Sequence, residues 1–346
     1  MVRRGKSRRG RARRLGIATG RAGRNAAPIA VARRPRRERG IALLATMLAT
    51  ALMTILVVDF TASSSLAYRA AANQANELRA LYLARSGVAV GLALLERDSI
   101  SDAMQQQPYD ALTDIWAQPT PPVPIGGGYA AVSIVDEARK LDINQLYNPR
   151  TGAVDGNYLQ IIARLFEAIG VSTNLIPVIV DWLDPDSVTS PGGAESDYYL
   201  RLIPPYEARN GPMPTIGDLR ALAGVNDATF MLLTNYLTAT PELRINANTA
   251  PPEVLAALAP ELSNNPSLVQ QIVAARQLQP FLVVTDIANL PGIGQFAQNL
   301  TPLLTTRSSY FTITGEGDYA GARRRVYAIV RRNSNGSAML ISWHAD

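Results

Sequence analysis

The chain has 346 residues, a formal net charge of +6 and no cysteine. A chain of this length can hold a sizeable core and more than one domain. The lack of cysteine excludes disulfide bonds, thiol nucleophiles and thiolate metal sites, so a translocated protein of this composition would depend on packing or on metal for stability.

The charge is divided unevenly along the chain. Residues 1–40 carry fifteen Arg or Lys and one acid, Glu38, a net charge of +14, whereas the rest carries 19 basic and 27 acidic side chains, a net charge of −8. Residues 1–40 are rich in Arg, Ala and Gly and are predicted to form a basic leader without fixed structure. By the positive-inside rule, this leader stays in the cytoplasm and the acidic body is translocated. Nucleic-acid binding by the leader is the alternative.

The leader ends at Gly40, and eighteen uncharged residues follow, from Ile41 to Val58. At about 1.5 Å per residue this run spans roughly 27 Å as a helix, close to the thickness of a bilayer core. We therefore expect residues 41–60 to be the transmembrane half of a long helix that continues to about residue 100. A secretory signal peptide is the alternative, but its apolar region would be shorter and small residues would follow it at the cleavage site.

Beyond the long helix, the hydrophobic pattern changes twice. Five prolines between residues 105 and 125 predict a connecting loop. Residues 129–135 read as a strand, and a helical period then starts at Tyr158 and stops at Gly170, with short helices continuing to about residue 305. The period of two returns in three predicted strands, at 310–314, 325–330 and 338–343, with turns at 315–321 and 333–336.

One strand thus precedes a helical block and three follow it. The simplest arrangement is an α+β fold in which the long N-terminal helix packs on a small antiparallel sheet, with a large helical domain inserted in the sheet. The predicted segments are the leader at 1–40, the transmembrane half-helix at 41–60, the remaining helix, loop and first strand or strands at 61–145, the inserted helical domain at 146–306 and the last strands at 307–346.

Several strings, in this order and spacing, resemble the K-type minor pseudopilin of type II secretion (general secretion pathway protein K). They are Arg39-Gly40-Ile41-Ala42-Leu43-Leu44, Leu141-Asp142-Ile143-Asn144, Asp181-Trp182-Leu183-Asp184-Pro185-Asp186 with Pro191 to Tyr199, and Arg244-Ile245-Asn246-Ala247-Asn248-Thr249-Ala250-Pro251. The resemblance implies a type IV pilin-like fold with a helical insertion, anchored in the bacterial inner membrane with a periplasmic body. It further implies a place at the tip of the pseudopilus, a part in starting its assembly for protein export across the outer membrane, and I- and J-type minor pseudopilins as partners.

The resemblance also implies processing at the end of the leader. A prepilin peptidase would cut between Gly40 and Ile41, and the freed amine of Ile41 would be methylated. Gly40 has no side chain, so the scissile backbone can enter a tight protease site. An uncleaved signal anchor is the alternative. The fifth residue after the cut is Ala45, where most pilins have Glu; K-type members lack that Glu, which fits a subunit with no subunit above it.

An acidic loop is the best candidate for a metal site. Five carboxylates lie within seventeen residues that also contain prolines and glycines, namely Asp181, Asp184, Asp186, Glu195 and Asp197. Calcium prefers six to eight oxygen ligands, and loops of this composition provide them. A solvated loop whose Asp residues cap helices is the alternative. Relatives bind calcium in the inserted domain, which favours a calcium site here.

A second function class comes from two short hairpins. Leu290-Pro-Gly-Ile-Gly294, and less closely Leu222-Ala-Gly-Val225, are similar to the hairpin of helix-hairpin-helix DNA-binding units. A membrane-anchored DNA-binding protein of the competence type is therefore the alternative function, although the residues after both hairpins offer no base to a phosphate. With no cysteine and one histidine, His344, the sequence offers no convincing catalytic constellation, and we expect no enzyme.

Overall fold

The computed structural model describes residues 36–106 and 109–346, and the leader up to residue 35 lies outside the described residues. The chain divides into two compact units, one ending at Ala67 and one running from Tyr68 to Asp346. The first helix, α1 (Arg36–Gln105), contributes to both units. It begins before Ile41, and Gly87 and Gly91 do not interrupt it. It ends where Gln106 adopts a positive φ of 55°, two residues before Pro108.

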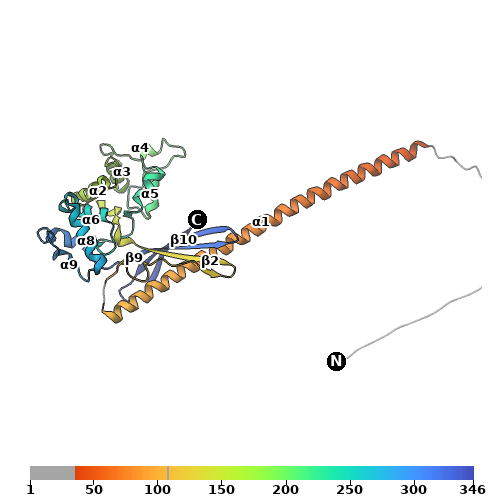
Figure 1. Ribbon diagram of the computed structural model, residues 1–346. Coiled ribbons are helices and arrows are strands. Elements are labelled where there is room, and N and C mark those ends of the chain that lie inside the picture. The colour runs from red at the N-terminus through yellow and green to blue at the C-terminus, as the bar shows by residue number, and fades with distance from the viewer. Residues whose placement is uncertain (1–35, 107–108) are drawn as a thin grey trace, which may run out of the picture. The chain divides into compact units, whose positions relative to one another are not determined.

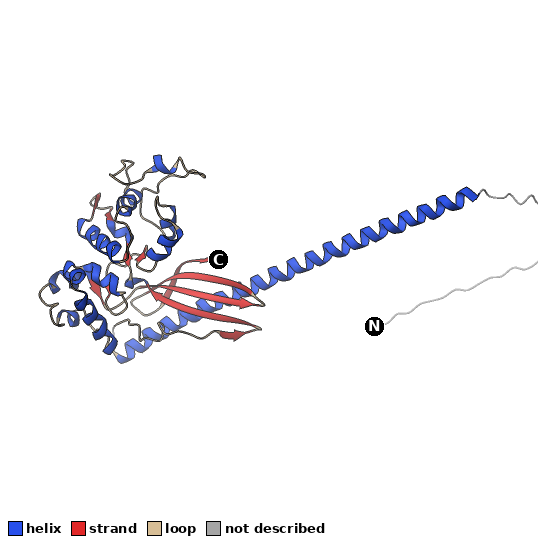
Figure 2. Ribbon diagram, turned by 45° about the horizontal axis from the view of Figure 1, so that its top comes forward, coloured by secondary structure: helices blue, strands red, loops and turns tan. Residues whose placement is uncertain are grey.

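The second unit contains a five-stranded sheet, shown with α1 in Figures 1 and 2. Its strands are β1 (Val123–Ile125), β2 (Gly128–Asp136), β9 (Tyr310–Tyr319), β10 (Ala322–Arg332) and β11 (Ala338–Ala345). They pair in the order β1-β2-β9-β10-β11, and every pair is antiparallel. The predicted fold class is confirmed, as are the four predicted strands, each of which is longer at one or both ends than predicted.

One face of this sheet packs on the part of α1 after Tyr68. The two elements bury a common core that includes Ala84, Val88, Leu95, Ile313 and Ala328. In β2 every second residue is buried, and the residues between them are exposed or half-buried. Because successive side chains of a strand point to opposite faces, this alternation buries one face of the strand against α1. This core holds the pilin-like part of the unit together.

The predicted turn at 315–321 is wrong, because β9 continues through Gly315 and Gly317 to Tyr319. A Cβ atom on Gly315 would lie 2.0 Å from the carbonyl oxygen of Ala84, and one on Gly317 would lie 1.9 Å from that of Ala80. These glycines therefore let the helix backbone approach the strand backbone closely, which is a known use of glycine within strands. Only residues 320 and 321 form the turn.

The sheet neighbours β2 and β9 are separated in sequence by a largely helical segment. Its helices are α2 (Gly156–Ala168), α3 (Leu175–Leu183), α4 (Ser196–Tyr199), α5 (Asp227–Leu233), α6 (Pro252–Leu258), α7 (Pro260–Asn264), α8 (Pro266–Leu278), α9 (Thr285–Ala288) and α10 (Ala297–Leu300), with 3-10 turns η1 (Glu137–Arg139), η2 (Ile143–Leu146), η3 (Ile216–Ala221) and η4 (Thr301–Leu303). Three two-stranded pairings accompany them: β3 (Leu141–Asp142) with β6 (Leu237–Thr238), β4 (Tyr147–Asn148) with β5 (Ala153–Val154), and β7 (Ile245–Asn246) with β8 (Leu304–Thr305). The helical segment has its own hydrophobic core.

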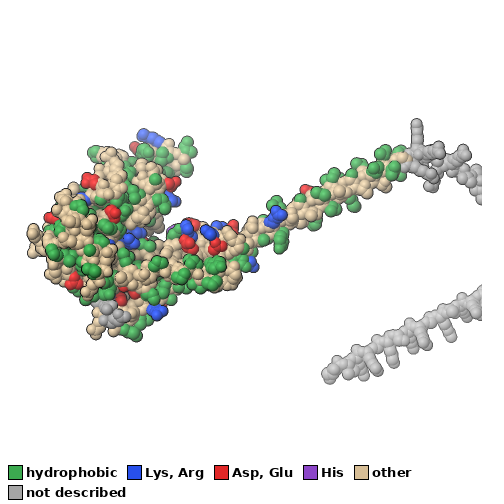
Figure 3. Space-filling model, in the orientation of Figure 1, with side chains coloured by type: hydrophobic (Ala, Val, Ile, Leu, Met, Phe, Trp, Pro, Cys, Tyr) green, Lys and Arg blue, Asp and Glu red, His purple; other side chains and the backbone are tan. Residues whose placement is uncertain are grey.

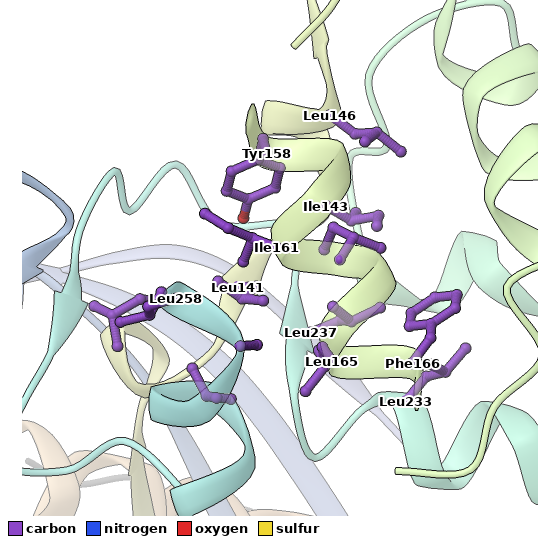
Figure 4. Packing of buried hydrophobic residues seen from close by; sticks show 14 of the residues in the cluster. Leu141, Ile143, Leu146, Tyr158, Ile161, Leu165, Phe166, Leu233, Leu237 and Leu258 are labelled. Atoms are coloured by element: carbon purple, nitrogen blue, oxygen red, sulfur yellow. The ribbon is translucent and has the colours of Figure 1, made fainter. Parts of the chain in front are cut away.

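α2 shows how the sequence builds this second core. Asp155 caps its first turn by accepting hydrogen bonds from the backbone N–H groups of Asn157 and Tyr158. The apolar positions repeat at helical spacing, so Ile162, Leu165 and Phe166 all belong to the buried cluster. Figure 4 shows part of this cluster, with Leu165 and Phe166 labelled. Gly170, with a φ of +71°, follows the helix, as its sequence predicted.

A buried polar junction connects the helical segment to the sheet. Asn246 is fully buried, and its side-chain nitrogen donates to the Asp110 carbonyl, the Asp136 carboxylate and the Ser308 hydroxyl, at 3.0, 3.2 and 2.8 Å. Thr249 also donates to the Asp136 carboxylate at 2.5 Å. The string from Arg244 to Pro251 therefore serves to join two layers of the fold, because each buried polar group there must find a partner.

Candidate functional site: membrane anchor and acidic loop

The first unit carries the membrane anchor. α1 is the one helix of the described chain that is long and apolar enough to cross a membrane, and none of its most apolar 18-residue window is buried. Figure 3 shows apolar side chains along this segment, and Ile41 and Leu48 are 68% and 73% exposed. Such exposure is unfavourable in water and favourable in lipid, so the segment fits a single-pass anchor.

Three threonines in the anchor satisfy their hydroxyl groups locally. Thr46 donates to the Leu43 carbonyl, Thr50 to the Thr46 and Met47 carbonyls, and Thr54 to the Thr50 carbonyl, all at 2.8 to 2.9 Å. Bonds back to the same helix remove the cost of burying a free hydroxyl in hydrocarbon. The three threonines are thus compatible with a lipid-facing helix.

The predicted processing site lies near the beginning of α1. Gly40 and Ile41 are both exposed, and a Cβ atom added at Gly40 would meet no atom within 4 Å. Packing within the chain therefore does not require a glycine at this position, which is compatible with a glycine required by the processing enzyme.

The acidic loop lies in the helical segment between α3 and α4. Asp181 is in the last turns of α3, Asp184 is its C-cap, Asp186 follows on the loop, and Glu195 is the N-cap of α4. The structure brings together three of the five predicted ligands, because one carboxylate oxygen each from Asp184, Asp186 and Glu195 lies within 4.8 Å of the others.

Two members of this trio carry oxygens that need a partner. Asp184 and Glu195 are 8% and 2% exposed, and Asp184 Oδ1 and Glu195 Oε1 are buried without a hydrogen bond. Burial is the main cause that raises the pKa of Asp184 to about 6, with help from the charges of Asp186 and Asp181. The pKa of Glu195 is also raised, again chiefly by burial. A cation between these groups would relieve both the burial cost and the repulsion, so the residues present fit a divalent metal.

The other two predicted ligands lie outside the trio. Asp181 is fully buried and accepts hydrogen bonds from the Ser190 backbone N–H at 3.1 and 3.2 Å, which closes the loop. Gly193 lies directly against it, since a Cβ there would fall 2.0 Å from Asp181 Oδ2. Asp197 is exposed in the first turn of α4. The spacing of acids in the sequence does not distinguish a ligand from a loop-closing residue.

A second group of acids was not recognised in the sequence. Oxygens of Asp98, Asp110 and Asp114 also lie within 4.8 Å of one another. The group is divided between the end of α1 and the connecting segment that follows. The available signal was the occurrence of four Asp between residues 98 and 114, two of them one helical turn apart.

The two hairpins that resemble DNA-binding units are parts of the helical core. Gly292 has a φ of +81° and faces Leu268, and the next residue, Ile293, is fully buried. Gly224 has the same φ and faces Leu175. Both hairpins pack helices together, and nothing in the described chain favours DNA binding.

The anchor and the fold define the class of this protein. A long N-terminal helix, apolar in its first half and docked on an antiparallel sheet in its second, is the architecture of a type IV pilin-like subunit. The chain is similar to one chain of a solved structure, that of the GspK-GspI-GspJ complex from the enterotoxigenic Escherichia coli Type 2 Secretion System. The TM-score is 0.67 and the sequence identity is 19%, and the match covers 80% of this chain and 99% of that chain.

Sequence comparison narrows this class to one family. The family profiles described as Type II secretion system (T2SS), protein K, match residues 139–242 and 245–307. The type II secretion system protein K of Pseudomonas aeruginosa is 28% identical over 89% of this chain and 92% of its own length, and that of Klebsiella pneumoniae is 28% identical over 90% and 99%. The chain belongs to the type II secretion system protein K family and is a minor pseudopilin.

Proposed function

We propose that this minor pseudopilin caps the tip of the periplasmic pseudopilus and helps initiate its assembly, together with I- and J-type minor pseudopilins. The observation that carries this proposal is the helical insertion between β2 and β9, which adds a second, separately packed core to one end of a pilin-like sheet. A subunit enlarged in this way is suited to an end position. Ala45 supports the same role, because no carboxylate is present there to pair with a subunit above. The similar solved chain was determined in a complex with GspI and GspJ.

The partner surface is proposed to include the outward face of α1 after Tyr68. Leu78 and Tyr82 are 56% and 58% exposed there, while Leu81 and Leu92 of the same helix are partly buried against the sheet. Exposed apolar side chains one helical turn apart are typical of helix–helix contacts.

Mixing purified soluble portions tests the partner proposal. The portion from Tyr68 should form a complex with I- and J-type soluble domains at micromolar concentration, measured by light scattering. Leu78→Asp with Tyr82→Asp should weaken the complex at least about tenfold, because charges would be buried in the contact. Met231→Asp is the matched control, since Met231 is 59% exposed on α5. No complex with the unaltered chain, or equal weakening by the control, would contradict the proposal.

The orientation is proposed from the charge border: a cytoplasmic leader, an inner-membrane anchor and a periplasmic body. The absence of cysteine makes a direct test simple. Ser187 is exposed on the acidic loop, so Ser187→Cys should react with a membrane-impermeant maleimide added to cells with a permeabilised outer membrane. Labelling only after the inner membrane is broken would contradict the orientation.

Processing is proposed between Gly40 and Ile41, followed by methylation of the Ile41 amine. The support is the position of Gly40, between the basic leader and the uncharged helix segment that begins at Ile41. Packing within the chain does not require a glycine there, because an added Cβ would meet no atom within 4 Å. Mass spectrometry of the assembled protein should find an N-terminus at methylated Ile41, and Gly40→Val should leave residues 1–40 attached. Recovery of assembled protein that retains the leader would refute this site.

Calcium is proposed at the acidic loop, with Asp184, Asp186 and Glu195 as ligands. The support is the convergence of their oxygens and the two buried oxygens without partners. When bound, calcium would neutralise the trio and hold α3 to α4. Because a ligand stabilises the native state by RT ln(1 + [L]/Kd), calcium at about 100 times Kd should add roughly 2.7 kcal/mol.

Thermal melting with calcium and with chelator tests this site. Chelator should lower the melting temperature, and Asp184→Ala with Asp186→Ala should abolish the difference. Asp197→Ala should preserve it, because Asp197 lies outside the trio. Equal melting curves with calcium and chelator would refute the site, and loss of the effect in Asp197→Ala would show that the ligand set is wrong.

The proposed role is structural and not enzymatic. The relatives carry the name of a secretion system protein, and the two acidic groups described above fit cation binding. Unaltered secretion by a chain with both acid groups disrupted but the fold preserved would argue against any chemistry at these carboxylates.

A further inference from the structure

The end of α1 and the segment after it bring four carboxyl groups around one guanidinium group. Asp98 and Asp102 lie one turn apart on α1, and Asp110 and Asp114 lie on the segment that leads to β1. Oxygens of Asp98, Asp110 and Asp114 lie within 4.8 Å of one another. The four acids Asp98, Asp102, Asp110 and Asp114 are here called the helix-end cluster. The cluster belongs to the pilin-like part of the chain and shares no residue with the acidic loop.

Arg332 at the end of β10 is the cation that pairs with the cluster, and its position is fixed. One nitrogen contacts Asp98 Oδ2 at 3.4 Å, and the other pairs with Asp110 Oδ2 and donates to the Ser308 carbonyl at 3.0 Å. The guanidinium carbon lies 4.9 Å from the centre of the Phe311 ring. Arg332 is therefore held to Asp98 and Asp110, and four carboxylates with one arginine would leave a net charge of −3.

The cluster contains buried oxygens without partners. Asp110 is fully buried, and its Oδ1 has no hydrogen bond, although its Oδ2 accepts from the Ser308 backbone N–H at 2.8 Å. Asp102 Oδ2 is also buried and without a partner. A buried carboxylate oxygen without a donor costs free energy that a cation would recover.

We propose that Asp98, Asp110 and Asp114 bind a divalent cation of the calcium class, at a second site separate from the acidic loop. Hard oxygen ligands from three carboxylates match the preference of calcium, and its flexible coordination suits ligands from a helix and a loop. The ion would join the end of α1 to the connecting segment, which Arg332 and Ser308 already join to β10 and to the start of β9. In a chain without disulfide bonds, it would fasten the long helix to its sheet.

Counting bound calcium on the full chain in detergent tests the proposal. Equilibrium dialysis with radioactive calcium should show that Asp98→Asn with Asp114→Asn binds one ion fewer than the unaltered chain. Asp184→Asn with Asp186→Asn is the matched variant of the acidic loop. If the acidic loop binds no calcium, the helix-end cluster should still account for one ion, so the two proposals fail independently. An unchanged calcium count in the Asp98 and Asp114 variant would overturn this one.

A second measurement covers the case in which the double variant fails to fold. Trp116 is buried two residues after Asp114, whereas Trp182 lies two residues before Asp184, so terbium at each site would be excited by a different tryptophan. Terbium luminescence should lose one component in Trp116→Phe. In the single variant Asp114→Asn the terbium affinity of that component should fall at least about tenfold. A terbium signal that needs only Trp182, or that is unaffected by Asp114→Asn, would refute the helix-end site.

Discussion

Replacing Gly317 by alanine should destabilise the portion from Tyr68 to Asp346, although alanine is normally the better residue within a strand. The added Cβ would lie 1.9 Å from the Ala80 carbonyl oxygen and 2.6 Å from the Ala84 backbone nitrogen. Ordinary contacts need about 3.5 Å, so helix and strand would have to separate locally by roughly 1.5 Å. Both partners are backbone atoms of α1, and no side-chain rotation can relieve the clash.

The expected cost follows from what that separation would loosen. Ala80, Ala84 and Leu95 of α1 are all fully buried against the sheet. Overpacking a core usually costs about 1–3 kcal/mol, and a clash between two backbones belongs at the upper end. At about 2–4 °C per kcal/mol for a unit of this size, the melting temperature should fall by roughly 6–12 °C.

Thermal melting followed by tryptophan fluorescence is the assay, because Trp116 packs edge-on against Phe311 in this core. Gly156→Ala is the matched control: it lies at the start of α2, with no atom within 4 Å of an added Cβ. The control should be neutral or up to about 1 kcal/mol more stable, because alanine restricts the unfolded chain. A Gly317→Ala chain that melts with the unaltered protein would refute the close-approach reasoning.

Three further perturbations have expected outcomes that separate buried from exposed interactions. Asn246→Ala should cost about 2–4 kcal/mol in urea unfolding, because it leaves Asp136 and other buried groups short of donors. Arg324→Ala should cost less than about 1 kcal/mol in the same assay, since its 2.8 Å pair with Glu77 is largely exposed. Burial raises the pKa of Asp142 from 3.8 to about 7. Between pH 3.8 and pH 7 the native state therefore binds a proton that the unfolded state lacks. The free energy of unfolding should fall as pH rises through this range, by up to about 1.4 kcal/mol per pH unit. Asp142→Asn should remove this dependence and gain stability relative to the unaltered chain from pH 5 to pH 7.5, and parallel melting curves for the two chains across that range would contradict it.

The sequence by itself determined the features that are written in neighbouring residues. The charge border at Gly40, the uncharged run to Val58 and the strand periods after residue 310 depend on local pattern, because a helix in lipid and a half-buried strand each need a fixed spacing of apolar side chains. The capped start of α2 and the glycine after its end are local in the same sense.

Tertiary structure decided the features that depend on residues distant in the chain. Gly315 and Gly317 look like turn residues in the sequence, and only the approach of α1 shows that they belong to a strand. The five acids of the loop are equivalent in sequence, and the fold separates Asp181, which closes the loop, from the three whose oxygens converge. The helix-end cluster was not predicted because Arg332, more than 200 residues away, and the connecting segment define it together. Side-chain convergence of this kind is set by packing between layers, which a local pattern does not contain.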